Sequence, residues 1–452
     1  MRRFFTFKRL AVVAVLLLML LVAAPLGYLA ADRWQSQGAL GETTRSLDRQ
    51  DPDWRLDDIV RVTNAKLPPD DRNSFVLATA ANELLPADCQ KRFLDFPDWS
   101  KSPPNVLLDA AVKAKLLAAL RGMEPATDLA RDLADLPDAG GNVIVMTPNP
   151  MDRLMQKEQD LRLTVALLRA DATLLAEDGK MGEAVRSVRA ALGTARALGD
   201  DPSMVGQLVR IALGAISARA AESVLNLGEP DAGLAELQAE FLRESVAPKL
   251  LVGLRGERSS ADRVMGEALP PRLYGRSDRA ACVDMLTHLV EAAKLPPEHR
   301  AAALRAVPCP RDGDPRYLLT ILIRASIDKA IDAALRNQGE LAAVAVGVAC
   351  ERHRRKFGHW PAALADIPKD ILPAVPTDPG DGLPIKYQRL ADRVVVYSVG
   401  PDGIDHGSDL NESTPRDKRD YGIRLYDVPL RRQPAPPPRV PEPEPPAPGD
   451  AP

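Results

Sequence analysis

The sequence predicts a mainly α-helical protein that ends in a small β-hairpin module and a proline-rich tail. Of the 452 residues, 45% are hydrophobic and only 4% aromatic, while alanine, leucine and arginine are abundant. This mixture favours helices, because straight-chain side chains lose little rotamer freedom in a helix. Apolar residues also recur every three or four positions through the middle of the chain. After Phe357, proline, glycine and β-branched residues become frequent, as is typical of turns and strands.

The first element is an apolar segment at residues 10–31, which contains no charged residue and follows four basic ones. A helix of about 22 residues at ~1.5 Å rise per residue covers ~33 Å, about the thickness of a bilayer core. The basic flank is expected to stay in the cytoplasm, and Tyr28 and Trp34 suit the opposite interface. We therefore expect residues 1–34 to form a signal anchor or transmembrane helix, with the rest of the chain outside the cytoplasm.

A cleaved signal peptide is the alternative interpretation, because residues 22–24 (Val-Ala-Ala) are similar to a small-residue cleavage site. Both interpretations export the rest of the chain. The expected location is the cell inner membrane, crossed once, with the bulk of the chain in the periplasm or an equivalent space. The expected partners are this membrane and other envelope proteins. The formal net charge is −3, from 59 basic and 62 acidic residues, so nucleic acid is not expected as a partner.

Two regions follow the apolar segment. Residues 35–54 are polar, rich in turn-forming residues and without a helical period, which predicts a linker. Residues 55–338 are expected to form an α-helical domain, either a helical bundle or a short α-solenoid. Its clearest elements are amphipathic stretches at 161–175 and 184–198, separated by Gly179. They predict an antiparallel helix pair.

This helix pair resembles one hairpin of a tetratricopeptide repeat. The pattern does not return at a period of about 34 residues, so a general α-hairpin is favoured over a repeat array. A third helix is expected to end near Leu227, where a glycine precedes a proline. The apolar run at 341–350 is too short to cross a membrane and predicts a buried helix. Further helices are expected at 104–120, 126–135, 233–268, 278–293 and 316–356.

Residues 51–86 open the folded body with the order Asp-Pro-x-Trp, Asp-Asp-Ile and Asn-Ser. This order resembles the start of a group of exported, membrane-anchored planctomycete proteins. The resemblance implies export and supplies no activity, because that group has no assigned chemistry.

The four cysteines are widely spaced and form no Cys-x-x-Cys motif, which excludes zinc-ribbon and thioredoxin-like sites. Cys89 and Cys309 lie in proline-flanked, loop-like sequence, and in an oxidising compartment we expect them to form a disulfide. Cys282 and Cys350 lie in apolar helical sequence, where a buried thiol is the commoner outcome.

Catalytic motifs are missing from the sequence, which contains no Gly-x-Ser-x-Gly, no His-Glu-x-x-His and no phosphate-binding loop. A charged cluster at 254–263 includes Arg255, Glu257 and Arg258. These residues either line a polar pocket or lie on a solvated helix face. The solvated face is the expected interpretation, because charged pairs at helical spacing are common on protein surfaces.

Residues 339–430 are expected to form a helix-plus-hairpin module that closes the helical body. Stretches at 383–390 and 392–400 have the alternation and β-branched content of a hairpin, and 421–428 is a candidate third strand. Residues 431–452 are proline-rich and predict an extended or disordered tail. A plain solvated tail is favoured over a wall-spanning spacer or a ligand for a proline-binding module.

An aspartate- and glycine-rich loop, "YSVGPDGIDHGSDLN", spans residues 397–411. It follows a helix, a Gly-x-Trp-Pro turn and an Asp-Pro-x-x-Gly-x-Pro strand entry. This order over residues 340–411 resembles the C-terminal region of the major pseudopilin of type II secretion. The resemblance implies a calcium ion held by Asp402, Asp405 and Asp409. Filament assembly is not implied, because the apolar segment lacks the glycine before it and the early glutamate that a prepilin has.

The chemistry of the loop leaves three interpretations open. Calcium binds six to eight oxygen ligands in a flexible cage, and three carboxylates with carbonyls turned inward at glycines fit that need. An EF-hand is excluded, because Ser413 stands at the twelfth position counted from Asp402. Aspartate and glycine are also the usual residues of plain turns. A transition metal bound through His406 is the third interpretation.

The leading functional hypothesis is a non-enzymatic, membrane-anchored extracytoplasmic scaffold that binds envelope proteins, with a C-terminal module stabilised by calcium where the loop binds it. The alternative is an exported enzyme whose site is assembled from dispersed residues of the helical domain. A deep pocket with convergent charged groups favours the enzyme, and a shallow apolar groove favours the scaffold.

Overall fold

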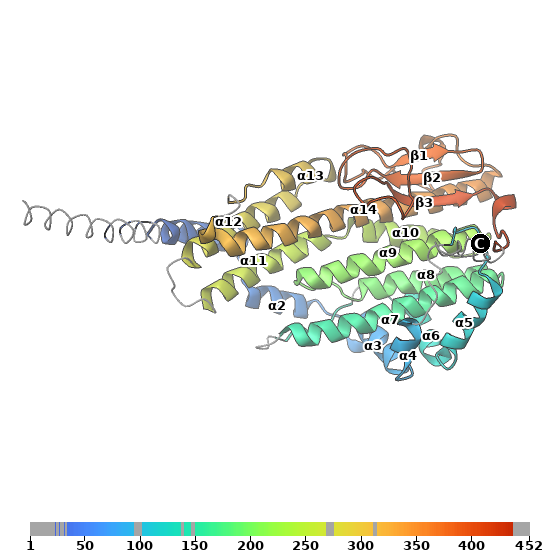
Figure 1. The fold of residues 1–452 in the computed structure, drawn as a ribbon, viewed down its shortest axis with the longest axis horizontal. Helices are drawn as coiled ribbons and strands as arrows, with labels where there is room; N and C mark the ends of the chain where they lie inside the picture. The colour runs from blue at the N-terminus through green and yellow to red at the C-terminus, as the bar shows by residue number, and fades with distance from the viewer. Residues whose placement is uncertain are drawn as a thin grey trace, which may run out of the picture.

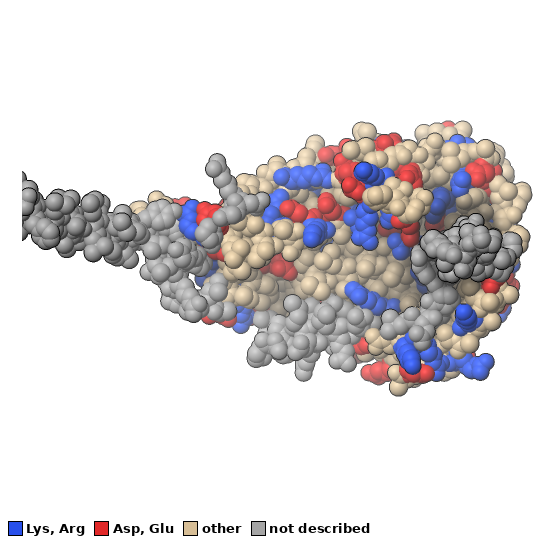
Figure 2. Space-filling model, in the orientation of Figure 1, with Lys and Arg blue, Asp and Glu red and all other residues tan. Residues whose placement is uncertain are grey.

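The computed structural model describes residues 34–94, 102–136, 140–145, 150–267, 275–310 and 314–436, together with single positions at 23, 27 and 31. These residues form a mainly helical protein with a three-stranded antiparallel sheet, which confirms the predicted class. Figure 1 shows long helices running side by side along an elongated body, with the sheet lying on one side of it. Figure 2 shows basic and acidic side chains interspersed over the visible face.

The apolar segment expected to cross the membrane, residues 10–31, lies outside the described residues except at 23, 27 and 31, which are helical. Among the helices that the structure describes, none combines the length and the apolar character that crossing a bilayer requires. Residues 34–50 are helical, which corrects the predicted linker. Leu40 and Leu47 fall on one face of this helix and pack with Trp54.

The first half of the body is built from short helices that the periodicity did not fully predict. The helix expected at 104–120 begins later, at Ala110. Asp109 caps its start by accepting a hydrogen bond from the Ala111 N–H at 2.8 Å. In chain order they are α2 (Leu56–Ala65), α3 (Ser74–Glu83), α4 (Cys89–Leu94), α5 (Ala110–Leu120) and α6 (Glu124–Arg131).

The predicted helix pair is confirmed as α7 (Pro150–Glu177) and α8 (Met181–Arg196). Gly179 lies between them with φ +78°, a left-handed conformation that favours glycine and ends a helix sharply. The third helix is α9 (Met204–Leu227), which ends where the sequence predicts. These three helices pack against one another and contribute many of the buried apolar side chains of the core.

The helix predicted at 233–268 is wrong, because the structure has two helices there, α10 (Leu234–Val246) and α11 (Lys249–Glu267). Pro248 separates them, and the preceding residue, Ala247, has an extended ψ of 136°. A proline restricts the residue before it to extended conformations and cannot continue the hydrogen bonding of a helix. The next two helices are α12 (Gly275–Ala293) and α13 (Pro297–Ala306).

Helix α14 (Leu318–Phe357), which is 40 residues long, runs from the helical body into the sheet module. The domain boundary predicted at 338 therefore falls inside one continuous helix. Residues 341–350 are all buried, as predicted. A Cβ on Gly339 would lie 2.1 Å from Ser398 Oγ, and one on Gly347 would lie 2.4 Å from an Ile423 methyl group. These two glycines let the sheet approach α14 closely.

The predicted hairpin and third strand are confirmed as β1 (Lys386–Arg389), β2 (Arg393–Ser398) and β3 (Tyr421–Tyr426), in the order β1-β2-β3. Val394 pairs with Leu425 and Val396 with Ile423, and all four side chains are buried in the core shared with α14. The free edge of β3 is covered by α9. The Asn226 side chain of that helix donates to the Arg424 carbonyl at 2.7 Å and accepts from the Tyr426 N–H at 2.8 Å, so it pairs with the backbone of β3.

Residues 428–433, which we call the strap, fold back over the ends of several helices. The strap corrects the prediction that the solvated tail begins at 431. Gln433 forms two backbone hydrogen bonds of 2.8 Å, with the Asn105 carbonyl and the Leu107 N–H. Arg432 donates to the carbonyls of Ala176, Glu177 and Leu227 at 2.7 to 3.0 Å. A guanidinium at these positions satisfies the unpaired carbonyls where α7 and α9 end.

Candidate functional site

The three aspartates nominated for calcium lie in one loop, but each is engaged in its own turn. Asp402 accepts a hydrogen bond from the Ile404 N–H at 3.1 Å and lies 2.9 Å from His406 Nε2. Asp405 accepts from the Gly407 N–H at 2.9 Å and from the Tyr397 hydroxyl at 3.2 Å. These bonds are typical of aspartates that stabilise turns.

Asp409 accepts hydrogen bonds from the Asn411 N–H at 2.9 Å and from Thr414 Oγ1 at 2.8 Å. Gly400, Gly403 and Gly407 have φ of 79°, 71° and 71°, which confirms the predicted positive φ at these positions. Within the part of the chain that the structure describes, no three His, Cys, Asp or Glu side chains are grouped as metal ligands. The calcium site remains a prediction.

Two buried aspartates, which the sequence pattern did not single out, hold this loop in place. Asp420 is 1% exposed and accepts from the N–H groups of His406 and Ser408 at 3.2 and 2.8 Å. Asp378 is fully buried and accepts from Ser398 Oγ at 2.7 Å and from the Val399 N–H at 2.8 Å. Burial raises the pKa of both carboxyls. Their role is structural, because Asp378 fixes the end of β2 and Asp420 fixes the backbone of the loop.

His406 is the histidine of the loop, and its ring faces Asp402. The hydrogen bond to Asp402 raises its pKa, and the charges of Asp402 and Asp420 act in the same direction. The imidazole therefore holds a proton more firmly than a free histidine. A protonated His406 binds metal poorly, which weighs against a transition metal in this loop.

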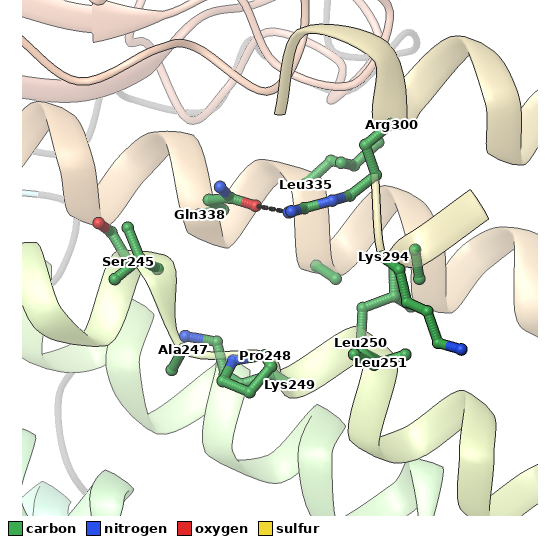
Figure 3. Close-up of a pocket in the computed structure, with 13 residues that line it drawn as sticks. Ser245, Ala247, Pro248, Lys249, Leu250, Leu251, Lys294, Arg300, Leu335 and Gln338 are labelled. Carbon is green, nitrogen blue, oxygen red and sulfur yellow. Dashed lines mark hydrogen bonds between the residues drawn. The ribbon is translucent and has the colours of Figure 1, made fainter. Parts of the chain in front are cut away.

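A first cavity, of about 150 Å³, lies between the α10–α11 turn, the end of α12, α13 and α14 (Figure 3). Its walls are mostly apolar. Arg300 crosses it and donates to Gln338 Oε1 at 3.2 Å and to the Leu295 carbonyl at 3.0 Å. Lys294 is bound to Glu291 at 2.6 Å. The volume lies below the roughly 300 Å³ at which small-molecule sites begin, and its polar groups have partners already.

A second cavity, of about 360 Å³, lies beside Trp54, between α2, α11 and α12. Charged side chains line much of it, and they pair with one another. Arg279 binds Asp262 at 2.8 Å, and Arg263 binds Asp57 at 2.9 Å. This is the larger of the two cavities and the one whose lining brings carboxylates and arginines together.

The charged cluster at 254–263 is not a solvated helix face, which corrects the sequence interpretation. Arg258 is fully buried and donates to Asp51 at 2.5 Å, and Arg255 donates to the same carboxylate at 2.6 Å. Glu257 accepts from the Met204 N–H at 3.3 Å, and burial raises its pKa. Asp51 lies about 200 residues earlier in the chain, so a helical-spacing rule does not reveal the pair.

A buried ion cluster joins α9 to the α10–α11 turn. Glu244 accepts from Arg210 Nε and Nη2, both at 2.8 Å, and from Lys249 Nζ at 3.1 Å. Burial alone acts to raise the pKa of Glu244, but the charges of Lys249 and Arg210 lower it to about 2. The carboxylate is thus ionised at all ordinary pH values, which is expected of a structural ion pair between helices and not of an acid–base group.

Glu340 is a carboxylate whose titration falls near neutral pH. It lies on α14 where the body meets the sheet module. Burial raises its pKa to about 7, against the lowering effect of Arg219 and Arg336. A carboxyl with this pKa changes its charge within the physiological range.

The four cysteines, all within the described residues, form no disulfide, so the predicted bridge between Cys89 and Cys309 is wrong. Cys89 packs with Met123 and Leu167 in a small apolar cluster, whereas Cys309 is exposed after α13. Cys282 is buried as predicted, and burial raises its pKa to about 12. Cys350 is also buried, and burial raises its pKa.

Comparison of the chain with known proteins gives no further guide to the site. No model of a protein family matches the chain, no curated protein matches it in sequence, and no solved structure matches its fold.

Proposed function

We propose that the chain is a non-enzymatic, membrane-anchored extracytoplasmic scaffold that binds other proteins of the envelope. One observation carries the proposal. Many of the charged groups that the fold brings together in its interior and in its cavities pair with one another across helix boundaries, as Glu244 does with Arg210 and Arg279 does with Asp262. Such pairs fix helices in one arrangement, and their members are engaged with each other rather than placed to act as an acid, a base or a nucleophile.

The anchoring part of the proposal rests on the apolar, uncharged segment at residues 10–31 and its basic flank. The helix at 34–50 follows this segment in sequence and packs on the body through Leu47, which contacts Val283. The C-terminal module resembles the major pseudopilin of type II secretion, a protein that works in the same compartment. On this account calcium at Asp402, Asp405 and Asp409 adds stability to the module and takes no part in a reaction.

The proposal is tested by capture from detergent-solubilised envelopes, with the full-length chain as bait, in the presence and in the absence of a chelator. The matched control bait carries residues 1–34 on an unrelated folded domain. We expect a reproducible set of envelope proteins on the full-length chain that the control does not retain. An identical set on both baits contradicts the scaffold, because the anchor alone then accounts for the binding.

The second cavity favours the alternative of an exported enzyme, because its volume falls within the roughly 300–1,000 Å³ of ligand sites and its lining is charged. Turnover there requires Arg279 or Asp262 to exchange its present partner for a substrate. Isothermal titration of the full-length chain and of an Asp262→Asn variant against a library of exported metabolites separates the two functions. A ligand that binds the natural chain and loses affinity in the variant supports the enzyme.

A further inference from the structure

The N-terminal helix enters the body beside the first turns of α12 and α14 (Figure 1). Ser36 Oγ lies 2.9 Å from Ser277 Oγ on α12. The next residue, Asp278, accepts hydrogen bonds from the N–H groups of Leu319 and Thr320, both at 2.9 Å. These contacts place the three segments together. We call this place, formed by residues 34–36, 275–279 and 314–322, the entry end.

Large apolar side chains remain exposed at the entry end. Leu318 is 57% exposed, Leu322 is 56% exposed and Trp34 is 79% exposed. Leu318 and Leu322 are four residues apart on α14, so they lie on one face of that helix. Tyr317 precedes them, and the Arg316 guanidinium lies 5.2 Å from the centre of its ring. Apolar side chains together with tyrosine, tryptophan and arginine are the composition of a membrane interface.

We propose that the entry end docks on the surface of the lipid bilayer, with Leu318 and Leu322 inserted among the lipid headgroups and upper acyl chains. Lipid is favoured as the binding partner because of the sequence that directly precedes Trp34. The apolar segment at 10–31 ends three residues before Trp34, so a span at that segment brings the entry end to the bilayer surface. The inference rests on the proposed anchoring and adds the orientation of the body, which then stands on the membrane by this end.

Docking on lipid gives these leucines a function that a protein partner does not explain equally well. A second copy or another envelope protein bound here has to fit between the body and the bilayer, beside the anchor. The lipid surface is present at this place in every molecule that is anchored. A protein occupant shields the leucines from lipid, and the test below distinguishes it by that property.

The test is photolabelling of the full-length chain in vesicles whose phospholipids carry a diazirine in the acyl chain near the headgroup. Labelled residues are mapped by mass spectrometry. Leu117 on α5 is the matched control, because it is 52% exposed on a helix at the opposite end of the body in Figure 1. We expect several-fold more label on Leu318 and Leu322 than on Leu117. We also expect a Leu322→Asp change to reduce the label on Tyr317, and a Leu117→Asp change to leave it unaltered.

Three outcomes separate the inference from the proposed function. Label on Leu318 and Leu322 well above the Leu117 level supports docking. Label confined to residues 10–31, with both leucines at the Leu117 level, overturns docking and leaves the anchor in place, whether water or a protein covers the leucines. A chain that does not float with the vesicles at all overturns the anchor, and docking with it.

Discussion

The strap end and the entry end of the body are closed by charges of opposite sign. At the strap end, Arg431 and Arg432 donate to carbonyls where α7 and α9 end. At the entry end, Asp278 accepts from the first N–H groups of α14. Each charge complements the helix dipole that it faces. The two ends differ in how they are covered. The strap covers its end with the chain's own residues, whereas Leu318 and Leu322 at the entry end are exposed to solvent.

Two buried ion pairs join residues far apart in sequence, one at the strap end and one between the N-terminal helix and α11. At the strap end Arg431 binds both oxygens of Glu351, at 2.9 and 3.1 Å, and both side chains are almost fully buried. Where the N-terminal helix ends against α11, Asp51 binds Arg258, with the carboxylate side chain 14% exposed. The strap pair is the more deeply buried of the two, so it should be the costlier one to break.

Removing the carboxylate of the strap pair should have the largest effect. A Glu351→Ala change leaves Arg431 buried without a counter-charge, and we expect the free energy of unfolding to fall by about 3–5 kcal/mol. Urea denaturation of the full-length chain measures it. Glu351 binds Arg354 as well, at 2.7 Å. Glu229→Ala is the matched control, because Glu229 pairs with the same Arg354 but its side chain is 43% exposed, and its loss should cost at most about 1 kcal/mol. Equal losses for the two variants contradict the account.

Removing the carboxylate of the Asp51–Arg258 pair should have the next largest effect. An Asp51→Ala change strands the buried guanidinium of Arg258, and we expect a loss of about 2–3 kcal/mol in the same denaturation assay. Asp57→Ala serves for comparison, because the Asp57 side chain is 78% exposed in its pair with Arg263, and that change should cost no more than about 0.5 kcal/mol. A larger loss of unfolding free energy for Asp51→Ala than for Glu351→Ala contradicts the expected order of the two ion pairs.

Glu340 lies between the ends and should make stability depend on pH. Its folded pKa of about 7 lies above its ordinary value of 4.5, so the folded chain binds more protons than the unfolded chain between these values. Stability from this group therefore falls as pH rises through that window. We expect Glu340→Gln to raise the free energy of unfolding by about 2 kcal/mol at pH 8 and to have little effect at pH 4. The value at pH 8 is smaller than the pKa difference alone would give, because the side chain is partly exposed to solvent.

Denaturation curves at the two pH values measure this effect. Glu83→Gln, on an exposed position of α3, is the control and should leave the pH dependence as it is. A Glu340→Gln chain that keeps the pH dependence of the natural protein shows that another group titrates in this window.

The aspartate loop should have the smallest effect on stability without calcium, because its carboxylates bond to residues of the same loop and to Thr414 directly after it. We expect the double change Asp402→Ala and Asp405→Ala to cost about 1 kcal/mol or less in chelator. Millimolar calcium should raise the Tm of the natural chain and leave that of the double variant unchanged. Differential scanning calorimetry measures the Tm. If calcium does not raise the Tm of the natural chain, the aspartates form turns and no calcium site.

The fold was predictable wherever a local pattern carried it. Periodicity located α7, α8 and α14, and the β-branched residues of β2 located the sheet, because these signals are contained within a dozen neighbouring residues. The break at Pro248 was also visible in the sequence, since a proline inside a helical pattern is a stop signal. The helix at 34–50 was missed because its apolar face consists of few residues, among them Leu40 and Leu47.

The charged interior was not predictable from the sequence. Asp51 and Arg258 are 207 residues apart, and Glu351 and Arg431 are 80 apart, so neither spacing nor composition connects them. The loop at 397–411 drew attention because its carboxylates are neighbours in sequence, yet each bonds within its own turn. The cluster of aspartates in sequence thus indicated turns, and the buried ion pairs became visible only when the fold brought distant residues together.

The central claim is that the body stands outside the cytoplasm, tethered by the entry end. Protease added to intact spheroplasts tests it most directly, with an antibody against the sheet module to follow the chain. We expect the module to be digested before the membrane is permeabilised, while a cytoplasmic marker protein stays intact. A module that survives until detergent is added places the body in the cytoplasm and contradicts the account.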